Sequence, residues 1–272
     1  MKDRVFTILH LSLAEYPQPS LLAFKGNRES WLRHALSERF VFVGRNSRRF
    51  EWVPKIVSHE HILGLIQAEK PYAYHDAPAE GGGERVDNFW QGAYLFLDPS
   101  HHEDGQKMAI ENDVVGTPLS LALAIFKNIN SREETPFSCI PKLIFKDQEF
   151  WKFAKESGEI LRYITFKFAI PNMWSPQSDI EEDLKATGLE TGAETVEVSF
   201  KSEGGVRTDN DRVKAAVEYS RRGAGTVTAR NFQGKNFSSN MQAMTERVIA
   251  DDLLEPSEVK VSAVAKRVLR RD

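Results

Sequence analysis

Cysteine is almost absent from this chain of 272 residues, and its scarcity excludes one class of protein. The single cysteine, Cys139, cannot form an intramolecular disulfide, so the chain is not a small disulfide-stabilised secreted domain. Cys139 lies in an apolar stretch and not among basic residues. Because a reactive thiolate needs a base or a positive charge nearby, we interpret Cys139 as a core residue.

Long apolar runs are also missing. No stretch approaches the roughly 20 apolar residues that span a bilayer. The amino-terminal segment carries Lys2, Asp3 and Arg4 and then alternates like a β-strand, which differs from the pattern of a signal peptide. We therefore expect a cytoplasmic protein with no membrane partner.

The motifs of the common nucleotide and hydrolytic sites are missing as well. The three glycines 81–83 are not followed by the lysine and hydroxyl residue of a phosphate-binding P-loop. There is no Gly-x-Ser-x-Gly elbow, no His-Glu-x-x-His and no Cys-x-x-Cys pair. No cofactor is expected, and the sequence gives no support for ATP binding, dinucleotide binding or acyl transfer through serine.

The composition that remains is that of an ordinary folded protein. Apolar residues make up 41% and charged residues 28% of the chain, close to the averages for globular proteins. Helical and strand patterns are mixed along it, which predicts an α/β (mixed α+β) fold. In a first domain, residues 1–158, we predict strands at 5–13, 40–43, 92–97 and 140–145, helices at 28–40, 119–129 and 147–157, and a mobile loop at 70–88.

Regular alternation dominates the region that follows. Residues 159–240 predict a β-α-β-α-β sandwich, in which Ser178 and Glu181 form a capping box and Gly188 and Gly223 end the two helices. Its strands are expected at 160–170, 194–201 and 226–230, and its helices at 178–188 and 210–222. Residues 241–272 are expected to form two helices, 241–254 and 256–271, as a carboxyl-terminal appendage.

Charge is distributed unevenly along the chain. Residues 1–200 carry 22 basic and 29 acidic side chains, whereas residues 201–272 carry 14 and 10, with no acid between Glu218 and Glu246. Basic loops that alternate with aromatic residues can hold phosphates while bases stack on the rings. We predict nucleic acid, DNA before RNA, as the partner. The phosphate contacts are assigned to Arg45, Arg48 and Arg49 beside Phe50, and to Arg221, Arg222, Arg230 and Lys235 beside Phe232.

Histidines are concentrated in the first part of the chain. His101 and His102 follow Asp98 at the end of a predicted strand, where α/β proteins often place ligands or an acid–base pair. These three residues are the catalytic candidates. His59 and His61 have the spacing of one strand face and are candidate ligands for a divalent metal. The same residues are also good turn and helix-cap residues, so a purely structural role stays open.

The order of parts in the middle of the chain resembles that of a known family. Phe145, the strand at 163–168, the segment 192–198 and the amphipathic helix after it are similar to bacterial and prophage phage-exclusion proteins of the Rex A type. The likeness extends over roughly half of the chain. It implies a DNA-associated defence protein that works as a dimer, and it carries no catalytic residue over to this sequence.

Three hypotheses about function follow from these observations. The leading one is a non-enzymatic nucleic-acid-binding or sensing protein of a phage-defence or mobile-element system. The alternative is a metal-dependent hydrolase, in the simplest case a nuclease, built on the histidine and aspartate cluster. The third is a structural subunit of a larger complex or homo-oligomer, with the carboxyl-terminal helix docked on a partner.

Overall fold

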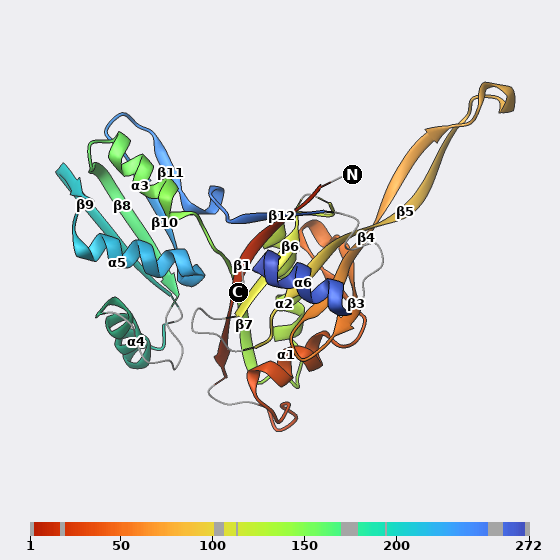
Figure 1. Cartoon of the computed structure of the whole chain (residues 1–272), viewed down its shortest axis with the longest axis horizontal. Coiled ribbons are helices and arrows are strands. Elements are labelled where there is room, and N and C mark those ends of the chain that lie inside the picture. Colours follow the sequence, from red (N-terminus) through yellow and green to blue (C-terminus); the bar gives the residue numbers. More distant parts are fainter. Residues whose placement is uncertain are drawn as a thin grey trace.

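Two antiparallel sheets organise the chain, each with its own hydrophobic core (Figure 1). The computed structural model describes residues 3–16, 20–100, 106–112, 114–169, 179–193, 195–249 and 258–269. The mixed α+β prediction is confirmed. None of the described helices is both long and apolar enough to cross a membrane.

The first sheet has eight strands in the order β12-β1-β6-β5-β4-β3-β2, with β7 also paired to β1. Alternating apolar residues along β1 explain why this strand is central: Leu9, Leu11 and Leu13 face one core, and Phe6 faces another. The strands are β1 (Asp3–Glu15), β2 (Phe40–Val43), β3 (Arg49–Val57), β4 (Ile62–His75), β5 (Glu84–Leu97), β6 (Gln106–Glu111), β7 (Phe137–Leu143) and β12 (Thr245–Ile249).

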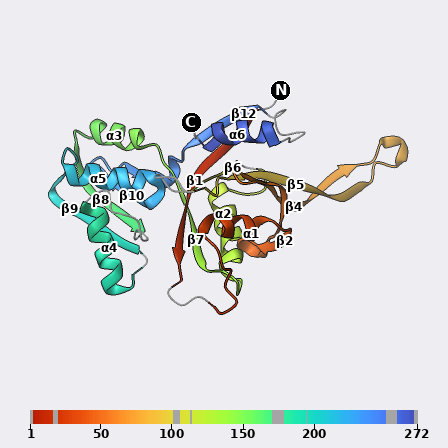
Figure 2. The ribbon, with the colours of Figure 1, turned by 60° about the horizontal axis from the view of Figure 1, so that its bottom comes forward.

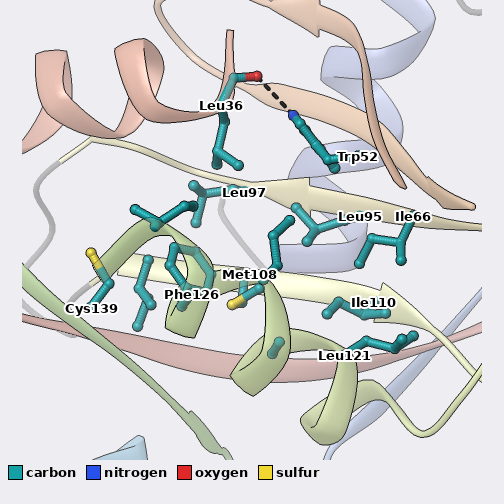
Figure 3. Packing of buried hydrophobic residues seen from close by; sticks show 14 of the residues in the cluster. Leu36, Trp52, Ile66, Leu95, Leu97, Met108, Ile110, Leu121, Phe126 and Cys139 are labelled. Atoms are coloured by element: carbon teal, nitrogen blue, oxygen red, sulfur yellow. Dashed lines mark hydrogen bonds between the residues drawn. The ribbon is translucent and has the colours of Figure 1, made fainter. Parts of the chain in front are cut away.

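The larger core lies between this sheet and the helices α1 (Arg28–Leu36) and α2 (Pro118–Asn130). Figure 3 shows Phe126 of α2 next to Met108 and below Leu97 of the sheet. The indole Nε1 of Trp52 donates a hydrogen bond of 3.0 Å to the Leu36 carbonyl oxygen, which fastens α1 to β3. Cys139 is buried here, and its burial raises the pKa of the thiol to about 12. It is therefore an inert core residue, as predicted.

The carboxyl-terminal segment returns to the first sheet. Helix α6 (Glu258–Leu269) packs Val264 and Val268 against Phe6 and Phe96 on the face opposite α2. The predicted helix at 241–254 is wrong, because this segment contains strand β12, which pairs with residues 3–7 of β1. The edge of β1 needs backbone hydrogen-bond partners, and that long-range requirement overrides local helix propensity. The segment is thus part of the first sheet's structure and not an appendage.

The second sheet has the strand order β11-β10-β8-β9 and carries helices on one face only. Its strands are β8 (Ile160–Ala169), β9 (Thr195–Arg207), β10 (Gly225–Arg230) and β11 (Asn236–Ser238). The helices are α3 (Asp147–Glu156), α4 (Asp179–Thr191) and α5 (Asp211–Tyr219). Inward-facing Ile164, Phe166 and Val227 pack with Phe150 of α3 and Val217 of α5. The predicted β-α-β-α-β order is confirmed, with α3 packed on this core as well.

A long hairpin projects from the first sheet (Figures 1 and 2). Strands β4 and β5 stay paired from Ile62 and Leu97 out to His75 and Glu84. The mobile loop predicted at 70–88 is therefore wrong for most of its length. Both faces of the outer hairpin are solvent-exposed, so its sequence has no amphipathic alternation to reveal the strands. The glycine and proline residues that suggested a loop form only the tip, where Gly81 adopts a φ of 97°.

Candidate nucleic-acid interface

The first predicted basic stretch lies at the turn between β2 and β3. Arg45 and Arg49 are exposed there. Arg48 donates from Nη1 to the Val115 carbonyl oxygen at 2.9 Å, and its guanidinium lies 5.3 Å from the centre of the Phe50 ring. Strand β2 is the edge strand on one side of the first sheet. The second sheet approaches the other side, where the turn after its helix α5 contacts β1 and β7. These three arginines therefore lie far from the other predicted basic residues.

The Arg221 and Arg222 side chains are both engaged by one carboxylate. Arg221 donates to Glu218 at 2.5 and 2.8 Å, and Arg222 donates to it at 3.0 Å. The hydrogen bond from Arg221 is the main cause that lowers the pKa of Glu218, with a further contribution from Arg222. Much of the positive charge of this pair is thus neutralised within the protein, and its contacts are structural.

Arg230 and Lys235 form the other pair within the second predicted stretch. Both lie at the turn between β10 and β11, where the Lys235 amide donates to Asn231 Oδ1 at 2.9 Å. The five steps along β10 from Gly225 to Arg230 span about 16 Å at 3.3 Å per residue, and they separate this turn from Arg222. The predicted arginine set thus occupies three separate places, and no single surface joins it.

The face of the second sheet opposite its helices forms a polar surface that includes Arg230. Register places Tyr163 between Arg230 on one side and Lys201 on the other. We call this surface the platform. Residues that alternate with the buried core positions point to it, and the described helices leave it uncovered. Its members are Tyr163, Thr165, Lys167, Glu197, Ser199, Lys201, Thr226, Thr228 and Arg230.

The platform has three rows of residues that run across the strands, and its first and third rows are basic. The first row contains Arg230, Tyr163 and Lys201, and the third row contains Lys167. In the middle row, Thr165 Oγ1 and Ser199 Oγ are 2.9 Å apart and share a hydrogen bond. Glu197 lies opposite Lys167 and is the acid in these three rows. This arrangement can hold a chain of phosphates while offering one aromatic ring for stacking.

Sequence reasoning found Arg230 and Lys235 but missed Tyr163, Lys201 and Lys167. The alternation at 160–170 does indicate which residues share a face of the strand. It does not say which face the helices cover, nor that β8 lies between β9 and β10. Only the strand order makes Tyr163 a neighbour of both cations.

Asp98 follows β5, and His59 and His61 lie in the turn between β3 and β4, so these candidates belong to the first sheet and not to the platform. Asp98 is 4% exposed, and its Oδ1 accepts a hydrogen bond of 2.9 Å from the Ser100 amide. His59 is exposed and His61 is 8% exposed. Among the described residues no group of three histidines, cysteines or acids is placed to hold a metal ion. His101 and His102 lie outside the described residues.

His61 anchors helix α6 to the β3–β4 turn. Its Nε2 is 3.2 Å from the Ser262 hydroxyl and 3.4 Å from a Glu60 carboxylate oxygen. Burial lowers the pKa of His61, and the negative charges of Glu60 and Asp98 offset part of that effect. A cleft of about 610 Å³ opens beside these residues, with Lys266 on its wall. The described contacts give His61 a structural role, in packing and in hydrogen bonding.

No protein-family model matches the chain, and no curated protein matches it either. The geometry of the platform is therefore the basis for inferring a function.

Proposed function

We propose that the chain binds single-stranded nucleic acid on the platform of its second sheet. The observation that carries the proposal is the row in which Tyr163 lies between Arg230 and Lys201 on an open sheet face. A nucleic-acid base can stack on such a ring, while the flanking cations attract the phosphates on either side. A single strand suits the surface because a duplex hides the faces of its bases.

The chemistry of the platform sets the expected strength and selectivity. Stacking of one base on an aromatic ring contributes about 1–3 kcal/mol. Three contacts from Arg230, Lys201 and Lys167 give a logarithmic salt slope of about −2 for a single strand. These hydroxyl groups and cations do not distinguish strongly between the hydrogen-bonding edges of different bases, so the affinity should depend little on the base sequence. The resemblance to phage-exclusion proteins favours DNA as the ligand and a role in defence.

The test is a fluorescence-anisotropy titration of a 15-nucleotide single strand at low salt, with DNA and RNA in separate arms. Tyr163→Ala should weaken binding by about 5- to 150-fold, because about 1–3 kcal/mol of stacking is lost. Tyr72→Ala is the matched control, because Tyr72 is an exposed tyrosine of the distant hairpin. The proposal fails if the wild-type chain retains neither strand, or if Tyr163→Ala binds as tightly as the control.

The cationic contribution is tested with a second pair of variants. Arg230→Gln combined with Lys201→Gln should flatten the salt slope, because two phosphate contacts are lost. Arg45→Gln combined with Arg49→Gln removes the same charge from the exposed β2–β3 turn. This control pair should leave the slope unchanged. Equal effects of the two pairs would mean that net charge, and not the platform, governs binding.

A further inference from the structure

The outer part of the β4–β5 hairpin is a two-stranded ribbon with no other strand of the described chain beside it (Figure 2). Strand β3 pairs with β4 only as far as Gln67, and β6 pairs with β5 only over Leu95–Leu97. Beyond Gln67 the ribbon extends over residues 68–75 of β4, or about 26 Å at 3.3 Å per residue. A two-stranded ribbon alone is only marginally stable in water, so a surface that covers it would stabilise it.

Large apolar side chains are exposed along this ribbon. Tyr72 is 58% exposed, and its ring centroid lies 6.0 Å from that of Phe89 and 6.1 Å from that of Tyr74. Register places these three rings on one face, and it places Trp90, which is 53% exposed, on the other. Exposed apolar surface that is gathered in this way is typical of an interaction site.

The outer end of the ribbon is acidic. Residues 75–87, which we call the acidic tip, contain four acidic residues and one basic residue. The basic residue is Arg85, and its Nε donates to Asp76 Oδ2 at 2.7 Å. Glu84 and Asp87 are exposed and form no ion pair with any residue that the structure describes. The acidic tip therefore keeps most of its negative charge exposed to solvent.

The other end of the ribbon lies beside a cluster of opposite charge. Strand β3 runs antiparallel to β4 and begins at Arg49, two residues before the pair of Glu51 and Gln67. The β2–β3 turn therefore lies at the end of the sheet from which the ribbon leaves. Residues 44–49, which we call the basic turn, contain three arginines and no acid. Arg45 and Arg49 are exposed and form no ion pair within the described part of the chain.

The acidic tip and the basic turn are complementary in charge. The three arginines give the turn a formal charge of +3, and four acids with one arginine give the tip −3. In one chain the two cannot meet, because the paired ribbon holds them apart by about its own length. A second copy related by a two-fold axis brings them together. When two ribbons lie side by side and antiparallel, each tip reaches the base of the other ribbon, and both contacts form at once.

We infer that two copies of the chain associate through their hairpins, with the acidic tip of each copy on the basic turn of the other. The face that carries Tyr72 and Phe89 lies between the two ribbons and is covered by its counterpart. Burial of the rings favours association, and the charges at the two ends select the antiparallel orientation. Exposed ion pairs contribute only about 0.2–1 kcal/mol each, so the association should be weak and should decrease as salt is added. The inference does not depend on the platform.

Sedimentation velocity at low salt tests the association, from low to high micromolar concentrations of the chain. The wild-type chain should change from monomer to dimer across this range. Glu84→Lys combined with Asp87→Lys, the tip variant, should raise the dissociation constant by about tenfold or more, because like charges then meet at both ends. Arg45→Glu combined with Arg49→Glu, the turn variant, should have the same effect for the same reason.

A mixture of the two variants distinguishes this interface from a general effect of charge. In an equal mixture, each lysine-bearing tip meets a glutamate-bearing turn and each acidic tip meets a basic turn. The mixture should therefore form a heterodimer with about the wild-type affinity. Lys152→Glu combined with Lys155→Glu, at exposed positions of α3, changes the net charge as the turn variant does. This matched control should form the homodimer as the wild type does.

Three outcomes overturn the inference. The first is a wild-type chain that stays monomeric at the highest concentration. The second is a tip variant or a turn variant that associates as strongly as the control. The third is a mixture that associates no more strongly than its two components. All the substituted side chains are exposed, so the variants should fold.

Discussion

Replacing Lys142 by methionine should make the protein more stable at pH 7. Burial lowers the pKa of Lys142 to about 8, against 10.5 for a free lysine, which means that the folded chain holds the charged amine at a cost on the order of 3 kcal/mol at pH 7. Methionine keeps the apolar stem and removes the charge, so Lys142→Met should recover a large part of that energy. Proteins of this size gain about 2–4 °C per kcal/mol, and the melting temperature should rise by about 5 °C.

The difference in stability between Lys142→Met and the wild type should depend on pH. Below pH 8 the amine is protonated in both the folded and the unfolded chain, and the full cost is present. Between about pH 8 and pH 10.5 the unfolded chain binds more protons than the folded one, so wild-type stability rises with pH. The advantage of Lys142→Met should therefore shrink across this window and vanish above it.

Urea unfolding at pH 7, 8.5 and 10 measures the difference directly. Lys152→Met provides the baseline for the loss of a lysine at an exposed position. The reasoning is refuted if Lys142→Met is less stable than the wild type at pH 7, or if its advantage does not change with pH.

Three further predictions concern the hairpin and the turn that follows α5. Replacing residues 70–89 by an Asn-Gly turn should shift the melting temperature by less than about 2 °C, because the buried residues of β4 and β5 lie outside that range; a larger loss in a thermal melt would contradict this. Glu218→Gln should cost at most about 1 kcal/mol at pH 7, since the Glu218 side chain is 40% exposed and water screens its ion pairs. The lowered pKa of Glu218 means that this difference must disappear in acid unfolding curves as the pH falls below that pKa. Gly223→Ala should cost about 2 kcal/mol or more of stability, because of the positive φ of Gly223 and its approach to His10. If denaturation shows that the variant is as stable as the wild type, the close packing is ruled out.

The parts of the fold that could be predicted from the sequence are those with a one-sided environment. Strand β8 alternates because one face is buried and the other is open, and β1 alternates over its central part for a similar reason. Helix α5 begins after Asn210, whose side chain accepts a hydrogen bond of 2.9 Å from the Val213 amide, so the observed start lies one residue from that of the helix predicted at 210–222.

The parts that could not be predicted depend on distant segments. The outer hairpin has two exposed faces and therefore no period to read, and β12 is a strand because the edge of β1 is available. The candidate site could not be predicted from the sequence for the same reason. Tyr163, Lys201 and Arg230 are separated by tens of residues, and only the strand order makes them neighbours.

The central claim, that a single strand lies across the open face of the second sheet, is tested most directly by photo-crosslinking. A 15-nucleotide strand with one 5-bromodeoxyuridine is irradiated with the wild-type chain, and the crosslinked peptide is identified by mass spectrometry. A crosslink is expected within residues 160–169, at Tyr163, and it should be lost when unlabelled strand competes. Crosslinks confined to residues 45–49 or to α5, with none on β8, would contradict the central claim.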